Sequence, residues 1–134
     1  MWHDTKDVWL AGHDGDDRYR VTLQHIGSEE NPRQYHALEA RASTMLHKAR
    51  VRARRDLAAD GEPLTDAALM YAVARDPILD QEFSPLVKEF IVLGTVGGES
   101  TYRALFWLGG PDLLTAAQTA VREFHRLDDS TKKD

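Results

Sequence analysis

The chain has 134 residues, of which 42% are hydrophobic and 29% charged, and its formal net charge is −5. This length and composition are typical of a single globular domain with a sizeable hydrophobic core. The chain has no cysteine, which excludes disulfides, thiolate chemistry and cysteine-ligated metal sites. Its acidic balance argues against general adhesion to nucleic acid or to a membrane surface.

Residues 8–10 and 19–26 are predicted to form the strands of an N-terminal β-hairpin. The second segment alternates apolar with polar residues, so one of its faces is expected to be buried and the other exposed to solvent. The link at 12–17, Gly-His-Asp-Gly-Asp-Asp, is composed of turn-forming residues and lacks the spacing of a calcium loop. An isolated hairpin is marginal in water, so it must lie on the helices or pair with another chain. The candidate interface residues are Trp2, Trp9, Tyr19, Val21 and Leu23.

Residues 33–60 are predicted to form one helix of about seven turns, around which the other segments are expected to pack. Asn31 suits the N-cap, Pro32 the first helical position and Gly61 the stop. The side of the helix opposite its apolar stripe is only mildly polar, so neighbours can cover both faces. The apolar stripe of this helix comprises Tyr35, Leu38, Ala42, Met45, Leu46, Ala49, Ala53 and Leu57.

This helix also concentrates the positive charge of the chain. Residues 33–55 hold seven Lys or Arg and one acid, a charge of +6 in a chain of −5, which leaves −11 for everything outside. Two interpretations remain open: the cations are neutralised by acids elsewhere in the chain, which we favour, or they form a stripe that binds an anion such as nucleic acid. The cations of one flank are Arg41, Lys48, Arg52 and Arg55, and those of the other are Arg50 and Arg54.

The segments after this helix are predicted to form shorter helices. Thr65 suits the N-cap of a helix over 66–75. Asp76-Pro77 and Ser84-Pro85 each place a capping residue before a proline, which predicts two further helical pieces at 78–83 and 86–93. Residues 90–96 could instead be a strand, because Ile91, Val92 and Val96 are β-branched, although we favour helix.

The C-terminal third contains two glycine-rich breaks. Residues 94–101 lack the signature of a phosphate-binding loop, so we interpret them as a hinge between helices. After a short apolar piece at 101–108, Gly109-Gly110-Pro111 is expected to open a last helix over 112–127. Residues 128–134 are expected to form a charged, frayed tail.

No catalytic or metal-binding constellation emerges from the sequence. His36 and Glu39 have the i, i+3 spacing of carboxylate-bridged metal sites, but no second helix repeats the motif. We therefore expect no cofactor and no enzymatic activity. With no signal peptide or membrane-spanning segment in the sequence, a cytoplasmic location is expected.

The expected fold is a single domain, mainly α with a small β-hairpin, with an arm and linker at 1–30 and a helical body at 31–127. The first functional hypothesis is a non-enzymatic protein–protein interaction or assembly module with a protein partner or self-association. A small virion-assembly or tail-chaperone-type protein is one such module. The alternative is a nucleic-acid-binding module that uses the basic face of the long helix.

Overall fold

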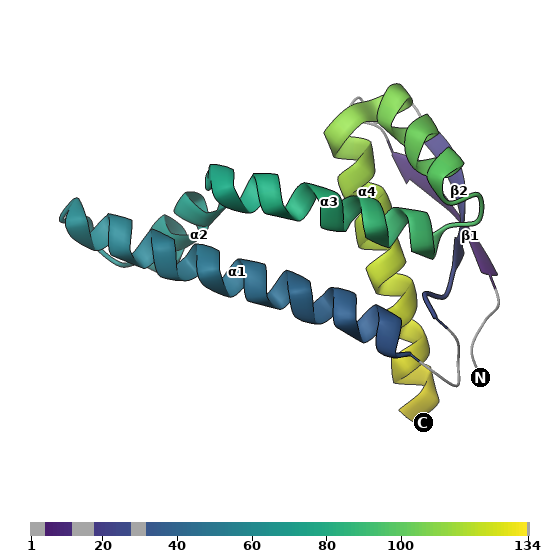
Figure 1. Ribbon diagram of the computed structural model, residues 1–134, viewed down its shortest axis with the longest axis horizontal. Helices are drawn as coiled ribbons and strands as arrows, with labels where there is room; N and C mark the ends of the chain where they lie inside the picture. Colours follow the sequence, from purple (N-terminus) through teal and green to yellow (C-terminus); the bar gives the residue numbers. More distant parts are fainter. Residues whose placement is uncertain (1–4, 12–17, 28–31, 134) are drawn as a thin grey trace. The chain divides into compact units, whose positions relative to one another are not determined.

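The computed structural model describes residues 5–11, 18–27 and 32–133. The described chain is mainly helical with an N-terminal hairpin, so the predicted fold class is confirmed. The chain divides into two compact units, the first comprising Met1–Tyr35 and Val87–Asp134 and the second His36–Leu86 (Figure 1).

The hairpin of the first unit is formed by β1 (Thr5–Ala11) and β2 (Arg18–Gln24), which pair antiparallel with Val8 opposite Val21. It agrees with the predicted strands, while the predicted turn at 12–17 lies outside the described residues. Helix α4 (Glu99–Lys133) contacts both strands. The hairpin is therefore supported by a helix of its own unit, which an isolated two-stranded ribbon requires.

The residues that follow helix α3 (Pro77–Gly94) pair with β2 through an isolated bridge. The chain is helical through Gly94, as favoured from the sequence, and Thr95 then forms an antiparallel bridge with Leu23. The Val96 N–H donates to the Thr22 carbonyl at 2.8 Å. A Cβ at Gly94 would collide with the Val121 side chain, so glycine permits the close approach of α3 to α4 here.

Helix α4 contains a break at the position that its glycines predict. Gly110 has φ 60° and ψ −149°, a conformation that only glycine adopts readily, and α4 changes direction there (Figure 1). Its backbone is helical to Lys133, beyond the end expected at residue 127. The buried residues of α4 after the break include four apolar side chains at helical spacing, Leu113, Ala117, Val121 and Phe124.

A buried histidine joins the end of the hairpin to α4. The Ile26 N–H donates to His125 Nε2 at 2.9 Å, and His125 Nδ1 lies 2.7 Å from the Val121 carbonyl. Since Nε2 accepts, Nδ1 carries the proton and donates to that carbonyl. The ring also stacks on Tyr35, with 4.0 Å between ring centroids. His125 therefore fixes the chain just after β2.

Helix α1 (Arg33–Ala59) forms as one uninterrupted helix, as predicted, and supplies most of its residues to the second unit. It ends where Gly61 adopts φ 73°, with the Glu62 N–H donating to the Leu57 carbonyl at 2.9 Å, a Schellman termination. The buried residues of its predicted stripe are Tyr35, Leu38, Ala42, Ala49 and Ala53.

The side of α1 opposite this stripe, which neighbours could also have covered, is exposed within the described part of the chain. The residues of that side, Ala40, Thr44, His47, Val51 and Ala58, are all exposed. Only one side of the helix carries large apolar residues at core spacing, so burial of the other side would add little hydrophobic free energy.

The remaining helices of the second unit begin at the capping residues that the sequence indicates. Helix α2 (Asp66–Ala74) begins after Thr65, whose hydroxyl accepts from the Ala68 N–H at 3.1 Å. Helix α3 begins after Asp76 and continues through Pro85, so the prediction of two separate pieces is wrong. A proline removes one helical hydrogen bond, and here the helix tolerates that loss.

Candidate protein-interaction surface

Helix α2 is the most apolar of the four described helices, yet none of its residues is buried. Met70 and Tyr71 have 72% and 60% of their surface exposed. A helix that is apolar all round is normally covered by its own protein, and clustered exposed apolar residues mark binding surfaces. The helix was predicted from the sequence but its exposure was not. The signal in the sequence that could have indicated this apolar surface is the unbroken apolar run over 67–74.

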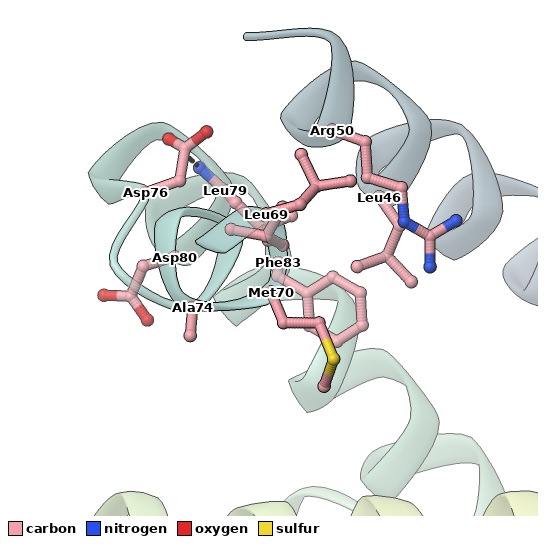
Figure 2. A pocket seen from close by; sticks show the side chains of 10 residues that line it. Leu46, Arg50, Leu69, Met70, Ala74, Asp76, Leu79, Asp80 and Phe83 are labelled. Carbon is pink, nitrogen blue, oxygen red and sulfur yellow. Dashed lines mark hydrogen bonds between the residues drawn. The ribbon is translucent and has the colours of Figure 1, made fainter. Parts of the chain in front are cut away.

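An apolar groove of about 450 Å³ lies along this helix, within the second unit. Leu46 enters it from α1, Met70 from α2 and Phe83 from α3 (Figure 2). Its volume falls in the range of pockets that bind ligands or anchor side chains of a partner. The other apolar side chains that line it are Leu69, Val73, Ala74 and Leu79.

The two sides of the groove carry opposite charges. Figure 2 shows Arg50, from α1, on one side and Asp80, from α3, on the other, with Leu69 and Phe83 between them. Both charged residues are exposed, and neither forms an ion pair within the described part of the chain. Their charges are therefore available to an occupant of the groove.

Asp76 holds the acidic side of the groove in place. Its Oδ1 accepts from the Ile78 and Leu79 N–H groups at 2.8 and 3.2 Å, and its Oδ2 accepts from Arg52 Nε at 2.9 Å. Desolvation raises the pKa of this carboxyl, but the hydrogen bonds from Arg52 and the two backbone groups outweigh it and lower the pKa overall. This carboxylate caps α3 and ties it to α1 at neutral pH.

The basic residues of α1 divide between the two interpretations, internal neutralisation and an exposed anion-binding stripe. Arg52 is half-buried and paired with Asp76, as internal neutralisation requires. Lys48, Arg54 and Arg55 are exposed, and like Arg50 they pair with no acid of residues 5–11, 18–27 or 32–133. Arg41 is exposed as well and has an interaction partner. The structure thus brings one predicted cation into an internal ion pair and leaves most of the others at the surface.

The hairpin candidates separate into surface and core. Trp9 is 64% exposed and Tyr19 is half-buried. Val21 and Leu23 are 5% and 1% exposed, so they are core residues of the first unit and present no surface to a partner. Their burial follows from the alternation of β2, which turns both side chains to the same face. Trp2 lies outside the described residues.

A second exposed apolar segment lies on α4 before its break. Phe106, Trp107 and Leu108 are 51%, 83% and 57% exposed, whereas neighbouring Leu105 is buried. From the sequence these residues are predicted only to form part of a short apolar piece. Three consecutive large apolar residues cannot all face one side of a helix, which is the signal that would have indicated exposure.

Comparison of the chain with protein-family models, with curated proteins and with solved structures found no match. None of the helices that the structure describes is long and apolar enough to cross a membrane. Among the described residues, no group of three or more His, Asp or Glu side chains is placed to hold a metal ion.

Proposed function

We propose that this chain is a protein–protein interaction module whose binding surface is the apolar groove along α2. One observation carries the proposal: α2, the most apolar of the described helices, has no buried residue and lies beside an apolar groove. Burying apolar surface is worth roughly 25 cal/mol per Å², so covering a face with Met70 and Tyr71 favours association. Methionine and aromatic side chains are also enriched at protein interfaces.

Two matched substitutions test this proposal in the full chain. Met70→Glu places a charge in the groove, whereas Val51→Glu places the same charge at an exposed apolar position of α1 that does not line the groove. We expect Met70→Glu to abolish association, measured by sedimentation velocity and by capture from an extract of the native cells, and Val51→Glu to leave it intact. A chain that stays monomeric and captures nothing, or whose association survives Met70→Glu, contradicts the proposal.

A small virion-assembly or tail-chaperone-type protein is the narrower class that we propose for such a module. Its support is the small size of the chain, the N-terminal hairpin and the exposed apolar helix.

The exposed cations of α1 support nucleic-acid binding as a second candidate function. Arg41, Lys48 and Arg55 share one flank of the helix and are exposed, while Arg52 of the same flank is engaged by Asp76. Two phosphate contacts on duplex DNA, from Lys48 and Arg55, predict a slope near −1.8 for log affinity against log salt, at about −0.9 per contact.

Fluorescence anisotropy with a labelled duplex tests this second candidate. Lys48→Glu should weaken binding uniformly across sequences and reduce the salt slope by about one contact. Absence of duplex binding at low salt excludes this function.

A further inference from the structure

We infer that the groove along α2 binds a second copy of this chain, so that two α2 helices pack against each other about a two-fold axis. The inference rests on the proposed interaction function and names the partner. It commits to a self-complementary pairing because the charges around the groove are themselves complementary.

The charges of the second unit are segregated but nearly balanced. His36–Leu86 contains seven Lys or Arg and eight Asp or Glu residues, a net charge of −1. Of the charged residues that line the groove, Arg50 on the α1 side and Asp80 on the α3 side are exposed. A partner of one charge sign would meet repulsion from one of the two sides, whereas a surface with the same bipolar arrangement can satisfy both.

A two-fold axis supplies that arrangement without a second kind of chain. In an isologous interface, residue i contacts j and residue j contacts i. An axis through the exposed face of α2 near Met70 would place Arg50 of each copy beside Asp80 of the other. It would form two identical ion pairs at the edges and bury the apolar side chains between them. Such a polar rim around an apolar centre is the ordinary anatomy of a protein interface.

Charge exchange tests this pairing, because its outcomes depend on the partner being another copy. Arg50→Asp and Asp80→Arg each place like charges across the axis, so we expect each to raise the dimer dissociation constant at least tenfold in sedimentation equilibrium of the full chain. An equimolar mixture of the two variants should form a mixed dimer, because positions 50 and 80 then carry opposite charges at both edges of the interface. The double variant Arg50→Asp/Asp80→Arg should recover the homodimer.

Lys48→Glu serves as the matched control, since Lys48 is exposed on the opposite side of α1 from Arg50 and should leave the dissociation constant unchanged. Far-ultraviolet circular dichroism confirms that each variant folds. Recovery in both the mixture and the double variant supports the inference. A wild-type chain that is monomeric at all concentrations, or single variants that dimerise normally, overturns it. Failure of recovery in either case also overturns it.

The two proposals fail in different ways. If the chain is monomeric but Met70→Glu abolishes capture of another protein, then self-pairing is overturned and the interaction function stands. If Met70→Glu changes no association of any kind, then the interaction function falls as well.

Discussion

The carboxylate of Asp76 is expected to contribute more to the stability of the second unit than any exposed acid of α3. Asp76→Ala removes the N-cap of α3, which costs about 1 kcal/mol. It also removes the charge-assisted hydrogen bond to Arg52, which contributes about 1.5–3 kcal/mol. The side chains of Asp76 and Arg52 are only 11% and 20% exposed, so water screens this pair weakly. We therefore expect a loss of about 2.5–4 kcal/mol in the free energy of unfolding.

Two further substitutions separate the cap from the charge. Asp76→Asn keeps an oxygen that can accept from the Ile78 N–H but loses the negative charge, so its cost should be smaller, about 1.5–3 kcal/mol. Glu82→Ala removes an exposed acid of the same helix and should change stability by less than about 0.5 kcal/mol. Urea denaturation, together with hydrogen exchange of the α3 amides, measures these differences.

The pH dependence of the difference between wild type and Asp76→Asn provides an independent check. The folded-state pKa of Asp76 lies below its ordinary value of 3.8. The contribution of the charge is therefore fully present above 3.8 and is lost as pH falls through the lower folded-state value. The stability advantage of the wild type should shrink in that acidic range. An advantage that persists unchanged into strong acid, or an Asp76→Asn variant as stable as the wild type at neutral pH, refutes this reasoning.

Three substitutions in the first unit follow from close packing and backbone geometry, each measured by thermal or urea denaturation. Gly94→Ala forces a Cβ into the Val121 side chain and should destabilise the fold by about 1–3 kcal/mol; a neutral result contradicts the close approach of α3 to α4. His125→Phe leaves the buried Ile26 N–H without its acceptor and should cost about 1–3 kcal/mol, and unchanged protection of that amide in hydrogen exchange would count against this bond. Gly110→Ala should cost about 1–3 kcal/mol from its backbone conformation alone, because its Cβ meets no neighbouring atom; full stability would show that α4 does not bend there.

Local signals in the sequence were sufficient for most of the secondary structure. The caps at Thr65 and Asp76, the stop at Gly61 and the break at Gly110 act through their own backbone neighbours, so each can be predicted without tertiary structure. The continuation of α3 through Pro85 could not, because the cost of a proline is weighed against packing along the whole helix.

The candidate surface was harder to predict from the sequence than the fold was. An apolar run such as that over residues 67–74 is equally compatible with a buried helix and an exposed one, and only the surrounding elements decide between them. The pairing of Arg52 with Asp76, 24 residues later, likewise depends on how α1 and α3 meet. The sequence gives the charge and hydrophobicity of each residue, but the tertiary structure determines which side chains pair with each other.

Photo-crosslinking from position 70 tests the central claim most directly. With a photoreactive amino acid in place of Met70 in the full chain, irradiation should produce a species that contains a second polypeptide, and mass spectrometry should locate the crosslink on α2 or the groove of another copy. The same amino acid in place of Val51 should give little such product. An absence of intermolecular product from position 70, or equal yields from the two positions, would contradict the account.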